Sequence, residues 1–188
     1  DGALVVGISS DGEVGAFKVT GTSDATAMRG PRYIECAYRA DDGVIWLGGR
    51  GMLWHSSGSP NESPTESQWT ALSLPIDRAH ADYYPVQALT RDRSGGLWVS
   101  VVRGGVLRLL DGEWTNFGDA SLSLATGQDG RVWLGYPRSR VQVGEPATAV
   151  VREFSVAEGL DLGNVMSILP RAQETWIGGE LGLARFDG

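Results

Sequence analysis

A short pattern around tryptophan recurs along this chain and constrains its fold more than any other feature. Each copy sets a tryptophan beside apolar residues and places glycine or serine two positions later. The tryptophans of successive copies are 52, 35 and 43 residues apart, and repeats of about 40–50 residues are typical of propeller blades and solenoid units. The four copies are Val44–Gly48, Gly96–Ser100, Arg131–Gly135 and Glu174–Gly178.

Turn-forming residues flank the tryptophan pattern. Tight hairpin turns are predicted where aspartate is followed by glycine, because aspartate accepts bonds from nearby backbone N–H groups and glycine adopts positive φ. These turns are Asp41–Gly43, Asp92–Gly95 and Asp129–Gly130. A second glycine-rich turn follows the tryptophan, as in Gly48–Gly51, and alternating apolar runs lie on both sides. Each unit therefore predicts an inner strand, the tryptophan strand, a third strand and an outer strand.

These units predict an all-β fold, a β-propeller of four-stranded antiparallel blades. A degenerate copy at Asp1–Gly7, with valine in place of tryptophan, brings the content to four to five blades. We expect a single propeller segment over residues 1–188, with blade cores near 1–20, 33–72, 85–117, 120–154 and 164–188. The repeat residues expected to be structural, with the tryptophans filling the space between blades, are Trp46, Trp98, Trp133, Trp176, Gly48, Gly135 and Gly178.

The last unit carries the clearest family resemblance. Gly159–Ile168 matches a glycine-leucine link followed by an inner strand, and Trp176–Phe186 matches a tryptophan-isoleucine-glycine-glycine turn that ends in an aromatic residue. These residues resemble the two-component regulator propeller repeat, found in the extracytoplasmic sensor region of bacterial hybrid and sensor histidine kinases. The resemblance implies a periplasmic location, a ligand sensed outside the cell, a homodimer, and a kinase domain that lies outside this chain.

Some positions depart from that repeat. Arg171–Glu174 lacks the aspartate-glycine turn, Ser100 replaces a glycine, and Tyr136–Arg140 replaces a glycine pair. The family that the chain resembles typically has seven blades, more than 188 residues supply. Because the first unit begins at its hairpin turn and the last stops after its third strand, we expect an incomplete arc of a larger, seven-bladed propeller.

Charge and composition exclude several classes of function. The chain has 16 lysines and arginines against 23 aspartates and glutamates, and a net charge of −7. Nucleic-acid phosphates would be repelled by this balance, so no nucleic-acid partner is expected. Cys36 is the single cysteine and forms no intrachain disulfide. No apolar run is long enough to span a bilayer, so a membrane would be met only through flanking regions.

Arginines in the turns after the blade tryptophans suggest a ligand-binding face. In propellers these turns share one face with the links between blades, which here include Pro75–Pro85. Arginine suits carboxylates and tyrosine stacks on sugar rings, which favours an anionic or polyhydroxylated small molecule, such as an acidic oligosaccharide. Exposed turns also carry arginine without binding anything. The candidate ligand-binding residues are Arg32, Arg50, His80, Asp82, Tyr83, Tyr84, Arg103, Arg138 and Arg140.

Catalytic patterns are weak in this sequence. His55 and His80 lack further ligands at a metal-binding spacing, so no metal site and no cofactor are expected. His80 and Asp82 have neither an activated nucleophile nor paired carboxylates beside them. We therefore predict a non-enzymatic, ligand-sensing module of a periplasmic two-component sensor. Two alternatives remain: a propeller-type lyase or hydrolase similar to streptogramin lyase, and a protein-interaction scaffold.

Overall fold

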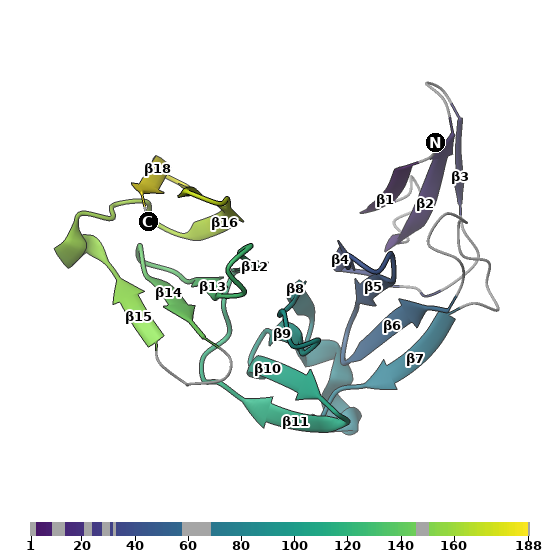
Figure 1. Ribbon diagram of the computed structural model, residues 1–188. Coiled ribbons are helices and arrows are strands. Elements are labelled where there is room, and N and C mark those ends of the chain that lie inside the picture. The colour runs from purple at the N-terminus through teal and green to yellow at the C-terminus, as the bar shows by residue number, and fades with distance from the viewer. Residues whose placement is uncertain are drawn as a thin grey trace. The chain divides into compact units, whose positions relative to one another are not determined.

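The computed structural model describes residues 3–8, 14–20, 24–27, 31, 33–57, 69–145 and 151–187. These residues form an all-β structure of five antiparallel sheets, three with four strands and two with three, and its helices are two short 3-10 segments (Figure 1). In every sheet the spatial order of the strands follows their order in the chain. This meander is the topology of a propeller blade, and it confirms the predicted fold class.

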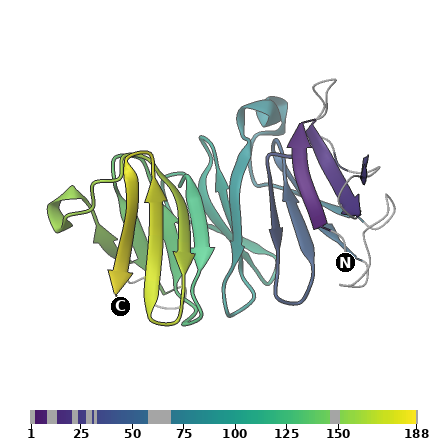
Figure 2. The same cartoon turned by 90° about the horizontal axis from the view of Figure 1, so that it is seen from above.

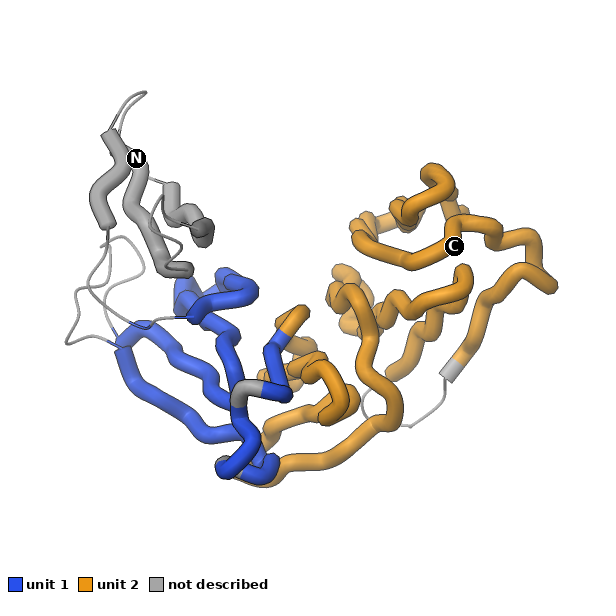
Figure 3. Tube along the Cα trace, turned by 180° about the vertical axis from the view of Figure 1, so that it is seen from behind, with its two compact units in different colours: residues 1–86 blue, residues 87–188 orange. Residues whose placement is uncertain are grey.

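The chain divides into two compact units, Asp1–Val86 and Gln87–Gly188 (Figure 3). The first unit holds two sheets and the 3-10 helix η2 (Arg78–Tyr83), which lies in the link between an outer strand and the next inner strand. Its first sheet consists of β1 (Ala3–Ile8), β2 (Val14–Thr20) and β3 (Asp24–Ala27). Its second sheet consists of β4 (Cys36–Arg39), β5 (Ile45–Gly48), β6 (Met52–Ser56) and β7 (Trp69–Ser73).

The second unit holds three sheets. The first sheet is formed by β8 (Val86–Arg91), β9 (Leu97–Val101), β10 (Gly105–Leu110) and β11 (Glu113–Asn116), with Val86 at the end of the preceding unit. The next sheet is formed by β12 (Ser123–Thr126), β13 (Val132–Gly135), β14 (Val141–Gly144) and β15 (Val151–Phe154). The 3-10 helix η3 (Val156–Glu158) leads to the last sheet, β16 (Val165–Pro170), β17 (Glu174–Gly179) and β18 (Gly182–Asp187), whose antiparallel strands are plain in Figure 2.

The hairpin turns have the chemistry that the sequence predicts. Gly43, Gly95 and Gly130 adopt φ values of 85°, 89° and 85°, where a side chain would be strained. The Asp129 carboxylate accepts a bond from the backbone N–H of Arg131 at 3.0 Å. The turn at Arg171–Glu174 closes without glycine through a bond from the Arg171 N–H to the Glu174 carbonyl at 2.7 Å. Strand β3 lies after residue 20, where the first blade core was expected to end.

The core of the second unit lies between successive sheets. Trp98 of β9 packs with Val132 and Leu134 of β13, and Trp133 of β13 packs with Val165 and Ile177 of the last sheet. These two indoles are 4% and 5% exposed, which suits aromatic rings that fill the space between stacked blades.

The approach of one sheet to the next also depends on glycine. A Cβ atom on Gly135 would lie 2.6 Å from the Cγ1 of Val165, so the inner strand of the last sheet comes this close only because the side chain is absent. Trp46 of β5 and Trp176 of β17 are only partly buried. Among the described residues, no helix has the length and apolar character that a bilayer crossing requires.

Candidate functional site

The predicted ligand-binding residues of the first unit lie near one another. The turn that carries Arg50 contacts the link after β7 through a bond from the Gly51 N–H to the Tyr84 carbonyl at 3.0 Å. The His80 and Tyr83 rings are 6.0 Å apart, and Tyr83 is 57% exposed. Arg32 and the side chain of Asp82 lie outside the described part of the chain.

Two of these side chains are already engaged by carboxylates. The Nε atom of Arg50 lies 3.1 Å from Glu35, and the Nδ1 atom of His80 lies 2.8 Å from Asp77. The hydrogen bond from His80 and a second from the Ala79 N–H hold the pKa of Asp77 below its usual value. The first unit therefore presents a polar, partly neutralised cluster in which the His80 and Tyr83 rings are both exposed.

The predicted arginines of the second unit occupy the expected turns. Arg103 lies between β9 and β10, and Arg138 lies between β13 and β14, both at positive φ. Arg140 stacks on the Tyr136 ring at 3.9 Å and faces Asp119 and Glu153 at 3.3 and 3.8 Å. The positive charge of Arg140 is thus balanced by these two carboxylates. Arg138 is exposed and has no ion pair within the described part of the chain.

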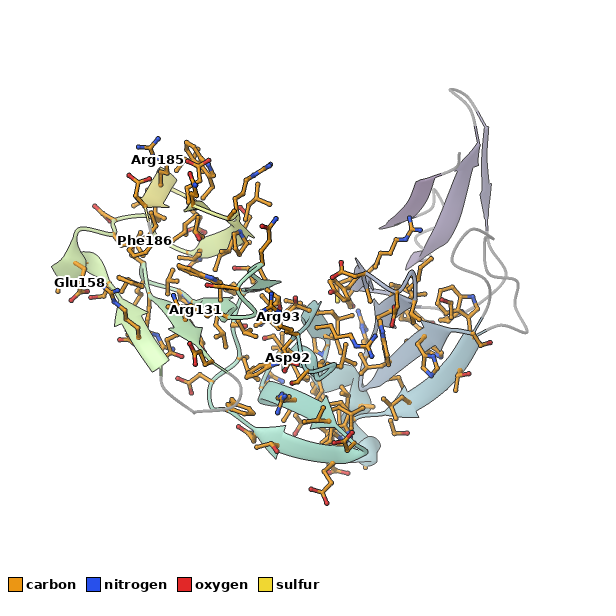
Figure 4. All side chains as sticks on the ribbon, viewed as in Figure 1. Asp92, Arg93, Arg131, Glu158, Arg185 and Phe186 are labelled. Atoms are coloured by element: carbon orange, nitrogen blue, oxygen red, sulfur yellow. The ribbon has the colours of Figure 1, made fainter. Side chains whose placement is uncertain are left out.

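A second polar cluster, which the sequence analysis does not predict, lies at the other end of the β8–β11 sheet. The carboxylate of Asp92 accepts bonds from the indole N–H of Trp98 at 2.8 Å and from Arg108 Nε at 2.7 Å. It also accepts from Ser94 and from the backbone of Gly96. Burial disfavours the charged form, but these bonds prevail and hold the pKa of Asp92 below its usual value. Figure 4 labels Asp92 at this turn.

The β12–β15 sheet repeats this geometry without its polar groups. Gly127 begins the β12–β13 turn with the same backbone bonds that Asp92 makes, and Val143 pairs with Trp133 as Arg108 pairs with Trp98. The indole N–H of Trp133 is buried and has no hydrogen-bond partner among the residues that the structure describes. An unsatisfied buried donor of this kind costs about 1–3 kcal/mol.

A cavity of about 440 Å³ opens at this position, between the β12–β15 and β16–β18 sheets. Gly127, Trp133 and Arg152 line one side, and Arg171 and Phe186 line the other. Figure 4 places Arg131 on one of these sheets and Phe186 on the other. The matching space between β8–β11 and β12–β15 is a cavity of only about 40 Å³, lined in part by Trp98 and Phe117.

The cavity lining holds three carboxylates and three guanidinium groups, but they are not all paired with one another. Its carboxylates are already engaged: Asp129 and Glu145 lie 3.6 and 3.7 Å from Arg131, and Glu174 accepts a bond from the Trp176 indole at 2.9 Å. Arg152 stacks on the Phe154 and Phe186 rings, with its Cζ atom 4.6 and 5.9 Å from their centroids.

Neither Arg152 nor Arg171 forms an ion pair with any residue that the structure describes. Two cations and one indole N–H therefore remain free to meet a ligand.

Sequence reasoning missed this cavity because it looked for charged residues in turns after the tryptophans. The turns before the tryptophans hold the signal. Aligned by their hairpins, the units place Ala40, Asp92 and Gly127 at one position and His55, Arg108 and Val143 opposite the tryptophan. Of these three units, only the one with Asp92 and Arg108 has a carboxylate and a guanidinium at these positions, so the sequence shows that the surroundings of Trp98 differ from those of Trp133.

Within the described ranges, no three side chains of His, Cys, Asp or Glu gather closely enough to hold a metal ion. Cys36 is a free thiol, and burial raises its pKa to about 12, so it stays protonated at neutral pH.

Comparisons with known proteins bear on the fold. No protein-family model matches the chain, and no curated protein matches it in sequence. Among solved structures, it is similar to the extracellular domain of the hybrid two component system BT4673 from B. thetaiotaomicron, with a TM-score of 0.68 and 15% identity over 94% of this chain and 26% of that one. The corresponding domain of BT3049 from the same organism is similar with a TM-score of 0.61 and 17% identity. That match covers 98% of this chain and 27% of the other.

A further similar structure is YCF48 bound to D1 peptide, with a TM-score of 0.67 and 14% identity over 94% of this chain and 61% of that one. The chain spans about a quarter of the length of the two extracellular domains. At these identities the likeness concerns the fold. It agrees with the meander sheets and with the repeat in the sequence, and the chain folds as a succession of propeller blades.

Proposed function

We propose that this chain is a non-catalytic, ligand-sensing propeller module of an extracytoplasmic two-component sensor. The observation that carries the proposal is the likeness in fold to the extracellular domain of a hybrid two component system, over 94% of the chain. The repeat at Gly159–Phe186 supports the same class, since it resembles the propeller repeat of such receptors. Fold alone does not fix function, so the ligand, the homodimer and the kinase remain parts of the proposal.

The surface predicted from the sequence provides one place for the ligand. Arg50, Arg103 and Arg138 lie in turns that follow blade tryptophans, and an acidic oligosaccharide would meet their guanidinium groups. Replacing all three by alanine in the intact receptor is expected to abolish saturable binding of that oligosaccharide, measured by calorimetry. An unchanged dissociation constant would reject this surface.

A lyase or hydrolase is the alternative to exclude by experiment. The full-length protein would be incubated with acidic and neutral polysaccharides, and new reducing ends and unsaturated sugars would be measured. A sensor is expected to bind without forming product. Turnover that disappears in His80→Ala would replace the sensing proposal with an enzymatic one.

A protein-interaction scaffold is favoured by one observation, the similarity to YCF48, whose structure contains a bound peptide. A periplasmic extract passed over the immobilised chain would test this function. Stoichiometric capture of one protein, together with no response to small molecules, would favour the scaffold over the sensor.

A further inference from the structure

We infer that the cavity between the β12–β15 and β16–β18 sheets binds a small organic carboxylate with an apolar body. The inference deepens the proposed sensing function and rests on it for its biological meaning. The binding step itself is tested on the chain alone.

The first argument is the volume. About 440 Å³ lies within the range of about 300–1,000 Å³ that small-molecule sites occupy. The equivalent space one blade earlier holds about 40 Å³, where Trp98 and Phe117 pack with ring centroids 4.5 Å apart. The larger cavity is therefore a local departure from the repeat, rather than a gap that stacked blades always leave.

The second argument is the hydrogen-bond donor. Trp133 is 5% exposed, lines the cavity and has no partner for its indole N–H in the described part of the chain. Within the same residues the N–H groups of Trp46 and Trp69 also lack partners, so this feature alone does not define a site. In the preceding blade the same donor is satisfied by a carboxylate, that of Asp92. A ligand carboxylate would supply the acceptor that Gly127 cannot.

The third argument is the charge. Asp129, Glu145 and Glu174 each have a cation or a donor, whereas Arg152 and Arg171 have no ion pair among the described residues. Bonds between guanidinium and carboxylate are about twice as strong as neutral ones. The lining has no net charge, so the preference for an anion comes from the two guanidinium groups that have no carboxylate partner among the described residues. The Phe186 ring and the indole of Trp133 supply apolar contact for the rest of the molecule.

The test uses phenylacetate as the probe and neutral phenylacetamide as its matched control. In chain labelled with ¹⁵N-tryptophan, the indole resonance of Trp133 is assigned with Trp133→Phe. We expect a saturable shift of this resonance with phenylacetate and none with the amide. Arg171→Ala is expected to weaken binding at least tenfold. Arg171 is exposed, so this variant should fold even if Arg152→Ala, which loses the stacking on Phe154, does not.

Several outcomes would overturn the inference. One is no saturable shift of Trp133 up to the solubility limit of phenylacetate, and another is an equal response to phenylacetamide. Arg138→Ala removes the same charge at the opposite end of the β12–β15 sheet, so an equal loss of affinity there would place the anion on the turns after the tryptophans. If phenylacetate binds at Trp133 while the full-length protein degrades polysaccharide, the sensing function fails and the cavity assignment stands.

Discussion

The β8–β11 and β12–β15 sheets contain the same buried tryptophan in two different chemical settings. In the first, Asp92 and Arg108 surround the indole of Trp98 with a closed set of bonds. In the second, Gly127 and Val143 leave the indole of Trp133 unbonded beside a cavity. The comparison teaches that the repeat tryptophan can stabilise one blade through its indole hydrogen bond and remain available to bind a ligand in the next.

The largest effect is expected from Asp92→Ala. This change removes the acceptor for four donors and leaves Arg108, whose side chain is 13% exposed, without its buried partner. Breaking a buried ion pair costs about 3–5 kcal/mol of the free energy of unfolding. Urea denaturation measures the loss. Asp129→Ala, at an exposed turn of the β12–β15 sheet, serves as the control and should cost less than about 1 kcal/mol. Equal losses would contradict the contrast between the two sheets.

A buried serine links the β13–β14 turn to the segment that leads into the next sheet. Ser139 is buried, and its Oγ accepts bonds from the Leu162 and Gly163 N–H groups at 2.8 and 2.9 Å, which ties the β13–β14 turn to the link that precedes β16. Ser139→Ala leaves both donors unsatisfied and is expected to cost about 2 kcal/mol. Differential scanning calorimetry would detect the lower Tm. Thr115→Ala, at an exposed residue of β11, should change stability by less than about 0.5 kcal/mol. A similar Tm for both variants would remove Ser139 from this role.

Gly127→Asn tests whether the indole of Trp133 can be given a hydrogen-bond acceptor like the one that Asp92 gives Trp98. Gly127 does not adopt positive φ, and a Cβ there would approach the Oδ1 of Asp129, which would weaken its exposed bond from the Arg131 N–H when it moves aside. The amide oxygen would accept the bond from the buried Trp133 indole, with an expected net gain of less than about 1 kcal/mol in the free energy of unfolding. The same substitution should weaken phenylacetate binding. A more stable variant with undiminished binding would separate the unsatisfied indole from the ligand site.

The smallest effect concerns pH. Because the pKa of Asp92 is lower in the folded chain than in the unfolded one, its charged form stabilises the fold above the unfolded pKa of about 3.9. That contribution is lost as the pH falls through the folded pKa. Chemical denaturation at pH values between 7 and 3 should show a shallower loss of stability for Asp92→Asn than for the parent chain. Parallel curves would mean that another carboxylate governs the acid response.

Residue patterns in the sequence predicted the repeating parts of the structure well. The turns at Gly43, Gly95 and Gly130 lie where aspartate and glycine place them, and the outer strands at Trp69–Ser73 and Glu113–Asn116 follow their alternating runs. Local conformational preference decides such features, so a sequence reveals them. The sequence does not predict the helix η2, because its six residues lack a helical pattern. Its one local signal is the cap at Asp77.

The sequence by itself determined that tryptophans spaced by a blade length would build meander sheets, because turn chemistry and strand alternation are local properties. Only the tertiary structure decided what each tryptophan meets. Trp98 and Trp133 each lie between two apolar residues in the sequence, yet one indole donates to Asp92 and the other lies beside a cavity with no partner among the described residues. The turn residue can be read from the sequence, but the bond that it accepts and the volume of the cavity depend on how strands pair and neighbouring sheets pack.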